Sequence, residues 1–352
     1  MPAGASRAVA RGVDSQHRED LSRKIMVRHL PRIPDGQVDS EDLRETLDEY
    51  AAGCEPTDLR QMDVLHSVYE SFRDVPALHQ LASRFWPQYG ALLRSHLSLL
   101  SEGLTHPYTV SNGRPATIAP ATLPLHVLVL GDNFLSASRS WQALSDCGSV
   151  VRPELLFCNN QGSQLAFRLR VLSSLARLVI QGHAGLAFSM MRARPRISQR
   201  PLSDALNTAW LRGSAFDVGL HNMGVIYRRD TIAAFRLGIL NAHIGHLPGL
   251  RGRSVLEWSL VYGVEPCVST FFVDEGIDTG ALIVDRYTPP AETAHEAPSL
   301  LEAKRRFFEL DGQCYRRAIA RLVRGGEGIV NQPTGHRFYS MSRLLTAAIS
   351  QP

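Results

Sequence analysis

Short apolar runs separated by helical segments fill the chain after residue 124. The first run, Leu-His-Val-Leu-Val-Leu-Gly at 125–131, ends in glycine and precedes a segment with apolar residues at helical spacing through Leu144. A continuous apolar run followed by a crossover helix is typical of a buried parallel strand. The alternation predicts a doubly wound α/β domain, with further strands expected at 150–158, 215–220, 237–241, 267–273 and 281–285.

The helices between and after these strands are indicated by capping residues and periodicity. We expect helices at 163–179 and 253–262, and a third that begins at a Ser203 cap and runs through Leu211. An amphipathic helix is expected at 297–324, with basic residues toward both of its ends.

The first 124 residues follow a different pattern. Asp39 or Ser40 can cap a helix, and apolar residues recur at helical spacing from 59 to 104, which predicts a small helical N-terminal module. The segment before it is rich in Arg and lacks apolar periodicity, and the segment after it is rich in Pro, Thr and Gly. We divide the chain into a mobile arm, the helical module, a linker, an α/β domain and a C-terminal helix with a short tail, at 1–22, 23–104, 105–124, 125–290 and 291–352.

Composition places the chain among ordinary globular proteins. Of its 352 residues 44% are hydrophobic and 20% are charged, which excludes collagen-like and wholly disordered chains. The 38 basic and 34 acidic residues give a net charge of only +4, so no dedicated nucleic-acid partner is indicated. Five cysteines without a CxxC spacing fit reduced thiols. Arg177 and His183 interrupt the most apolar stretch and the N-terminus lacks a signal-peptide pattern, so a cytoplasmic location without a membrane span is expected.

Several common functional motifs are absent. Gly131 stands alone after the first strand, without a GxGxxG or GxxxxGK[ST] pattern, and neither HExxH nor GxSxG occurs. A zinc site using His221, His243 and His246 would lack an organised ligand spacing, so no metal is expected.

The residues that could carry chemistry follow the strand expected at 237–241. Asn241 and His243 are two positions apart, so an extended backbone points both side chains to one side, toward the crevice beyond the carboxyl ends of the strands. An amide and an imidazole aimed at one point can hold a carbonyl oxygen as it becomes an oxyanion. Asp278 could orient His243, on a loop whose tight turn Gly276 and Gly280 permit. The plain alternative is a structural histidine and an ordinary Asp-Gly turn.

These residues resemble a known family. The pattern Asn-x-His-x-x-x-Leu-Pro-x-x-Arg-Gly at 241–252, followed by Asp-x-Gly-x-Asp-x-Gly at 274–280, is similar to that of the folate-dependent formyltransferases. That family includes methionyl-tRNA formyltransferase, glycinamide ribonucleotide formyltransferase and the nucleotide-sugar N-formyltransferases. The resemblance covers about 125–287, with a weaker echo at 332–344, and it implies a Rossmann-like catalytic domain.

The resemblance also implies a donor, a mechanism and a site. The catalytic residues would be Asn241, His243 and Asp278, and an amine would attack the formyl carbon of N10-formyltetrahydrofolate. Asn241 and protonated His243 would stabilise the tetrahedral oxyanion, while Asp278 would position His243 and a water for proton transfer. The pterin ring would lie against largely backbone groups, which correspond here to Met223, Gly224, Val225, Tyr227, Asp274, Glu275 and Gly276.

Three positions depart from the family pattern. Gly245 replaces the usual Ser, His246 stands where Leu is common, and Phe271 replaces a His often found before the Asp loop. None of these changes removes one of the three catalytic residues, but the first two alter the acceptor side.

The sequence is compatible with several acceptors of the formyl group. Arg251 and Arg253, with Trp-Ser-Leu-Val-Tyr-Gly at 258–263, resemble the amino-sugar enzymes and favour an amino-sugar nucleotide or another small biosynthetic amine, although both arginines could also be surface charge. Methionyl-tRNA is the runner-up, but the 61 residues after Ala291 are too few for the C-terminal barrel of the tRNA enzyme. A formyltetrahydrofolate hydrolase and a catalytically idle scaffold are further alternatives. The roles considered for the helical N-terminal module are structural packing, a homodimer contact, docking to a carrier protein and substrate selection.

Overall fold

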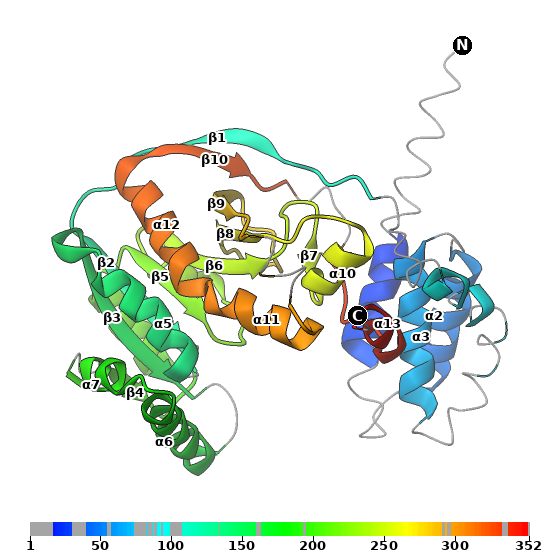
Figure 1. Ribbon diagram of the computed structural model, residues 1–352, viewed down its shortest axis with the longest axis horizontal. Coiled ribbons are helices and arrows are strands. Elements are labelled where there is room, and N and C mark those ends of the chain that lie inside the picture. The colour runs from blue at the N-terminus through cyan, green and yellow to red at the C-terminus, as the bar shows by residue number, and fades with distance from the viewer. Residues whose placement is uncertain are drawn as a thin grey trace. The chain divides into compact units, whose positions relative to one another are not determined.

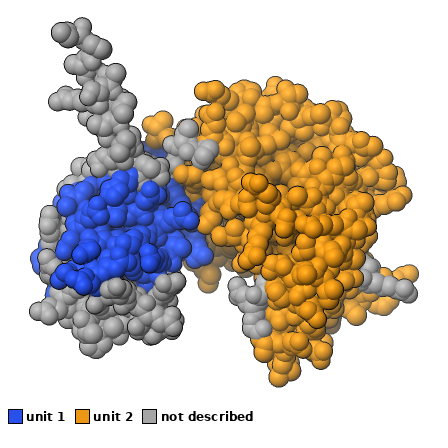
Figure 2. Space-filling model, turned by 180° about the vertical axis from the view of Figure 1, so that it is seen from behind, with its two compact units in different colours: residues 1–108, 252–264, 336–352 blue, residues 109–251, 265–335 orange. Residues whose placement is uncertain are grey.

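The computed structural model divides the chain into two compact units, which Figure 2 shows in different colours. Unit 1 comprises Met1–Tyr108, Gly252–Val264 and His336–Pro352, and unit 2 comprises Thr109–Arg251 and Glu265–Gly335. The structure describes residues 17–29, 40–54, 58–73, 83, 87, 90–92, 94–98, 108–132, 134–159, 163–192, 195–290, 293, 297–332 and 337–350. The division of the chain given above stays a prediction.

Unit 2 is built on a nine-stranded sheet, visible edge to edge in Figure 1. Five neighbouring strands are parallel, and the other four are each antiparallel to their neighbours. From the parallel edge the order is β4 (Arg196–Ser198), β3 (Val151–Cys158), β2 (Leu125–Gly131), β5 (Val218–Asn222), β6 (Gly238–Ile244), β8 (Val268–Phe272), β9 (Leu282–Tyr287), β10 (Gly326–Val330) and β1 (Arg114–Ile118).

Helices cover both faces of the parallel half, because alternate residues of each strand point to opposite faces. In β2, Val127 and Val129 pack with helices of one face, whereas Leu128 and Leu130 pack with the other. The first face carries α5 (Phe134–Ser145), α6 (Gln164–Ile180), α7 (Ala184–Arg192) and α12 (Asp311–Arg324), and the second carries α8 (Ala205–Gly213) and α9 (Arg229–Ile232). The predicted doubly wound α/β class is therefore confirmed.

Most predicted element ends are reproduced to within three residues, and two differ for identifiable reasons. Helix α8 begins after Asp204 rather than Ser203, because the Asp204 carboxylate accepts a hydrogen bond from the Leu206 backbone N–H. The single helix expected at 297–324 is two helices, α11 (Leu300–Glu309) and α12, which meet at Leu310.

The sheet edge formed by β1 and β10 has no counterpart among the predicted elements. β1 lies inside the segment expected as a linker, and β10 lies in the expected tail. Both are short and have a single buried residue each, so neither shows the apolar run of a buried strand. β1 pairs with β10, and β10 pairs with β9. These long-range contacts determine both strands, although the local preference of their residues for a strand is weak.

Unit 1 is helical in its N-terminal part, as predicted. It contains the π-helical turn η1 (Lys24–His29), α2 (Ser40–Ala52), α3 (Leu59–Arg73), α10 (Val255–Val261) and α13 (Arg343–Ile349). The short strand β11 (Arg337–Phe338) pairs with β7 (Arg251–Gly252). Residues 17–23 are helical although the predicted mobile arm includes most of them, and residues 1–16 of that arm lie outside the described residues.

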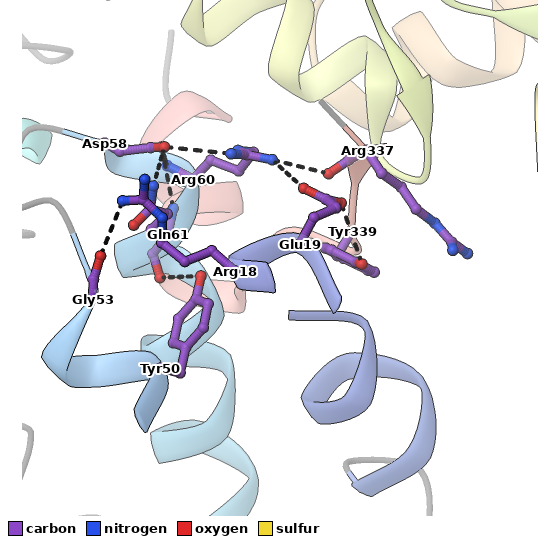
Figure 3. Close-up of polar contacts among 9 residues, drawn as sticks. All are labelled: Arg18, Glu19, Tyr50, Gly53, Asp58, Arg60, Gln61, Arg337 and Tyr339. Atoms are coloured by element: carbon purple, nitrogen blue, oxygen red, sulfur yellow. Dashed lines mark hydrogen bonds and ion pairs between the residues drawn. The ribbon is translucent and has the colours of Figure 1, made fainter. Parts of the chain in front are cut away.

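A buried guanidinium ties the two ends of the chain together within unit 1 (Figure 3). Arg60 is 11% exposed at its side chain, and its Nη1 donates to Glu19 Oε2 at 3.0 Å and to the Arg337 carbonyl at 3.4 Å. Its Nη2 lies 3.4 Å from Asp58 Oδ2. Two carboxylates thus compensate the buried charge, and an N-terminal helix is held against a C-terminal strand.

Two further findings bear on the sequence analysis. No helix within the described residues is long and apolar enough to cross a membrane. All five cysteines are free, and burial raises the pKa of the Cys158 thiol to about 12 and that of Cys267 to about 11. These two thiols are therefore protonated at neutral pH.

Asp63 in α3 predicts a pH-dependent component of stability in unit 1. Asp63 is 2% exposed and accepts a hydrogen bond from the Ser342 backbone N–H at 3.0 Å. Burial raises the pKa of Asp63 from 3.8 to about 6 against the lowering effect of the Ser342 hydrogen bonds. The folded state therefore binds this proton more tightly than the unfolded chain does. Stability from this group is present below pH 3.8 and is lost as the pH rises to about 6.

The Asp63→Asn variant should lack this component, which amounts to about 3 kcal/mol or less. Urea denaturation across the same pH window measures it, with Glu45→Gln on an exposed position of α2 as the control. Identical pH slopes in the wild type and Asp63→Asn would contradict the assignment.

Candidate active site

Strand β6 changes its pairing partners along its length, and this change defines the site. Its first part, Gly238–Leu240, pairs with parallel β5, whereas Leu240 through Ile244 pairs with antiparallel β8. The strand was expected to end at Asn241, and it continues to Ile244 because β8 supplies hydrogen bonds beyond the end of β5. Asn241 and His243 therefore lie on the same face of one strand, beside an edge that β5 does not cover.

His243 lies between two hydrogen-bond acceptors. Its Nδ1 is 3.5 Å from Asp278 Oδ2, and its Nε2 is 3.1 Å from the Leu250 carbonyl oxygen. The side chains of His243 and Asp278 are only 8% and 10% exposed, so solvent screens their interaction weakly. The Asp278 carboxylate and the Leu250 carbonyl are both acceptors, so the imidazole ring forms hydrogen bonds to both only when each of its nitrogens carries a hydrogen.

The loop that carries Asp278 is shaped by its own polar contacts. Asp274 Oδ1 accepts hydrogen bonds from the Gly276 N–H at 2.9 Å and from Thr279 Oγ1 at 2.7 Å. A Cβ at Gly276 would lie 2.0 Å from Thr279 Oγ1, so only glycine fits there. The left-handed residue of the turn is Asp278, with φ +56°, rather than either of the two glycines that the sequence suggested.

Asn331 holds this turn from a distant part of the chain. Its Nδ2 donates to the carbonyl oxygens of Asp278 at 3.1 Å and Gly280 at 2.8 Å, and its backbone N–H donates to the Ala281 carbonyl at 2.8 Å. The side chain is 3% exposed. Sequence reasoning missed Asn331, because a lone Asn after a weak strand carries no signal; the family echo begins one residue later.

His221 and Tyr227 form a second buried pair near Asp278. His221 lies in β5, and its Nδ1 is 2.7 Å from Tyr227 Oη. Burial lowers the pKa of His221 to about 4, while the Asp278 carboxylate acts in the opposite direction. His221 is therefore neutral at pH 7. In the sequence it stood out only as a weak zinc candidate, and no group of three His, Cys, Asp or Glu side chains that could hold a metal occurs within the described residues.

The first segment expected to bind the donor, 223–227, combines buried and exposed residues. Met223 and Tyr227 are each 5% exposed and pack into the core, with Val225 against it. Gly224 is exposed, its N–H donates to Asp132 Oδ2 at 3.3 Å, and no atom lies within 4 Å of the position of a Cβ. The neighbouring Ile226 is 63% exposed. The segment therefore offers backbone groups and one apolar side chain to a ligand.

The second expected segment, 274–276, forms an exposed ion pair with the start of α9. Glu275 Oε1 accepts from the Arg229 backbone N–H at 3.2 Å, and Glu275 Oε2 is 3.3 Å from Arg229 Nε. Arg229 begins α9, directly after the first segment. The structure thus links Glu275 to Arg229, two residues after Tyr227, and the assignment of both segments to donor binding stays a prediction.

The three departures from the family pattern have local structural consequences. Ser269 Oγ donates to the Gly245 carbonyl at 2.7 Å and accepts from the Leu247 N–H at 3.2 Å, which fixes the turn where the family has its own Ser. Burial, with the Arg286 charge, lowers the pKa of His246 to about 4, so His246 is neutral at pH 7. Phe271 is 1% exposed and packs with Leu247 in a small core cluster.

Comparison with known sequences confirms the resemblance. Residues 220–319 match the sequence model of the family described as formyl transferase, a range that contains Asn241, His243 and Asp278. A methionyl-tRNA formyltransferase of Cyanothece sp. is 38% identical over 90 residues, which cover 25% of this chain and 27% of that protein. One from Roseiflexus sp. is 28% identical over 173 residues, or 47% of this chain and 51% of that protein.

Among solved structures, this chain is similar to a 4-N formyltransferase from Francisella tularensis. It shares 13% sequence identity, with a TM-score of 0.44 over 65% of this chain and 87% of that chain. The segment similar to the formyl transferase family, 220–319, contains both motifs. The match to the Cyanothece relative spans about a quarter of that protein's length.

Replacing Asn331 by Leu should loosen the Asp278 turn. The change keeps a side chain of similar size but removes two hydrogen bonds and leaves two carbonyl groups without that donor. We expect the free energy of unfolding to fall by about 1–3 kcal/mol and amide exchange in 276–281 to accelerate.

Hydrogen-exchange mass spectrometry of the full chain measures this effect. Val330→Ala is the matched control, since it trims the adjacent residue of β10 without touching these hydrogen bonds. Unchanged protection of 276–281 in Asn331→Leu would show that Asn331 does not hold the turn.

Proposed function

We propose that this protein is a folate-dependent N-formyltransferase, which moves a formyl group from N10-formyltetrahydrofolate to the amine of a small acceptor. One observation supports this most strongly: His243 and Asp278 face each other at 3.5 Å, with Asn241 on the same face of β6 as His243. The match of the surrounding residues to the formyl transferase family supports the same assignment.

The donor fits the exposed backbone described above. The 223–227 segment presents Gly224 and the exposed Ile226, and Glu275 of the second segment pairs with Arg229, two residues farther along the chain. Backbone N–H and C=O groups can read the polar edge of a pterin, while an apolar side chain covers its face. The bound donor would supply an activated formyl group.

Each catalytic residue has a role that its position permits. The Asn241 amide would donate to the formyl oxygen as negative charge develops there. His243 Nε2, whose present acceptor is the Leu250 carbonyl, would donate to the same oxygen, while Asp278 keeps the ring oriented through Nδ1. Asp278 would also accept, through water, the proton that the attacking amine loses, and would pass it to the N10 nitrogen of the donor as the bond between that nitrogen and the formyl carbon breaks and tetrahydrofolate leaves.

For the acceptor we propose a small amine, with an amino-sugar nucleotide as the first candidate. Arg253 is exposed and Arg251 is half-buried, so both could contact a phosphate group. Methionyl-tRNA is the second candidate, because the sequence relatives carry that name. A hydrolase would use the same three residues with water in place of the amine and would release formate when no amine is present.

Substitution of the three residues should abolish transfer without abolishing donor binding. His243→Ala and Asn241→Ala should each lower the transfer rate about 10²- to 10³-fold, because each removes a donor to the developing oxyanion. Asp278→Asn keeps the size of the side chain but removes its negative charge, and it should lower the rate to a similar extent.

The assay follows formyl transfer from N10-formyltetrahydrofolate to a panel of amino-sugar nucleotides, other small amines and methionyl-tRNA. His126→Gln is the matched control, because His126 is a partly exposed β2 histidine that also faces a carboxylate, Glu154 at 2.7 Å. A wild-type rate in His243→Ala would refute the mechanism. Formate release that amines do not affect would favour the hydrolase.

A further inference from the structure

Helix α6 carries an apolar face that the protein leaves uncovered. Its buried side, which includes Phe167 and Leu178, packs into the core of unit 2. A second set of apolar residues recurs at helical spacing on the far side of the helix. These are Leu165, Leu169, Leu172, Val179 and Ile180, with exposed fractions of 67%, 56%, 62%, 53% and 82%.

The exposed apolar surface continues beyond α6. Phe188 and Met191 in α7 are 66% and 57% exposed, and Ile197 in β4 is 49% exposed. Figure 1 shows α6, α7 and β4 together at the end of the sheet where β4 is the edge strand. We call the apolar residues of α6 and α7 the α6–α7 face. Scattered exposed apolar residues are normal, but five of them at helical spacing on one side of α6 mark an interaction site.

The same part of the chain has a strongly one-sided charge. Between Glu154 and Asp204 the sequence contains no acidic residue and seven arginines, whereas the rest of the chain has 31 basic and 34 acidic residues. The net positive charge of the protein therefore originates in this segment. The arginines are Arg168, Arg170, Arg177, Arg192, Arg194, Arg196 and Arg200.

Exposed arginines occur on both helices of this face. Arg168 and Arg177 are exposed on α6, and the Arg192 guanidinium lies 5.9 Å from the centre of the exposed Phe188 ring. Long arginine side chains can lie along an apolar surface while their charge reaches a polar layer. The face therefore combines aliphatic side chains with cations at its margin.

We infer that the α6–α7 face docks on the surface of a lipid bilayer that contains anionic lipids. Such a surface can bury the aliphatic side chains of the face at the acyl boundary. Its anionic headgroups can neutralise the arginines, so it meets two needs of the face: burial of apolar side chains and compensation of positive charge. Helices that lie in the membrane interface have this combination of an apolar side and Arg at its border.

A second copy of the chain and a nucleic acid each satisfy only one of these two needs. A symmetric dimer through this face would bring Arg168, Arg177 and Arg192 of both copies together, and like charges there oppose association. A nucleic acid would neutralise the arginines, but its contacts are mainly with phosphate and base edges and would leave the leucines exposed.

Co-sedimentation with vesicles tests the inference on the full chain. The probes are vesicles of phosphatidylcholine alone and of equal parts phosphatidylcholine and phosphatidylglycerol. We expect binding to the anionic vesicles that weakens with salt, and little binding to the neutral ones. Leu169→Glu with Leu172→Glu, or Arg168→Glu with Arg177→Glu, should each weaken it about tenfold or more.

Matched controls separate this face from the general effect of added charge. Leu301→Glu changes an α11 leucine that is 79% exposed, and Arg316→Glu with Arg324→Glu changes exposed arginines of α12. These controls should bind as the wild type does, and circular dichroism should show that all variants fold.

Three results would overturn the inference. They are no sedimentation with anionic vesicles, equal binding by the leucine variant and the wild type, and equal binding to neutral vesicles. Without vesicle binding, a dimer seen by ultracentrifugation and lost in Leu169→Glu with Leu172→Glu would assign the face to a second copy. The outcome does not depend on formyl transfer, so it stands apart from the proposed activity.

Discussion

The exchange of partners along β6 is the constraint on which the candidate site depends. Parallel β5 pairs only with Gly238–Leu240, and antiparallel β8 takes over from Leu240 to Ile244. Past Leu240 the strand has one edge paired with β8 and one edge free of β5, so pairing with β8 sets the direction of Asn241 and His243. A strand fixes side-chain direction more firmly than a loop would, which suits residues that must meet a developing charge.

The second requirement is a turn that delivers a carboxylate to His243. Asp278 adopts a left-handed conformation, which is unfavourable for a residue with a side chain, and the contacts of Asp274 and Asn331 maintain it. Asn331 follows β10, so the antiparallel edge of the sheet contributes to the site through backbone contacts. Strand β10 is thus connected to Asp278, one of the residues proposed for catalysis, through the hydrogen bond from Asn331.

The sequence predicted the strands and site residues that depend on local pattern, and it missed those that depend on contacts between distant parts of the chain. Buried strands such as β2 appear as apolar runs, and strand periodicity alone places Asn241 and His243 on one face. The approach of Asp278 followed from the family motif, because spacing cannot show where a loop folds. Asn331 and the His221–Tyr227 pair reach Asp278 only through the fold, and β1 lacks a buried face that periodicity could reveal.

The most direct test of this account is a calorimetric titration of the full chain with 5-formyltetrahydrofolate, a stable analogue of the proposed donor. The account predicts saturable binding that raises the thermal unfolding temperature, because a ligand that binds only the folded state stabilises it. Binding should persist in His243→Ala, since the backbone of the 223–227 and 274–276 segments would hold the pterin. The absence of binding at saturating ligand, with a folded protein, would contradict the assignment of a folate site.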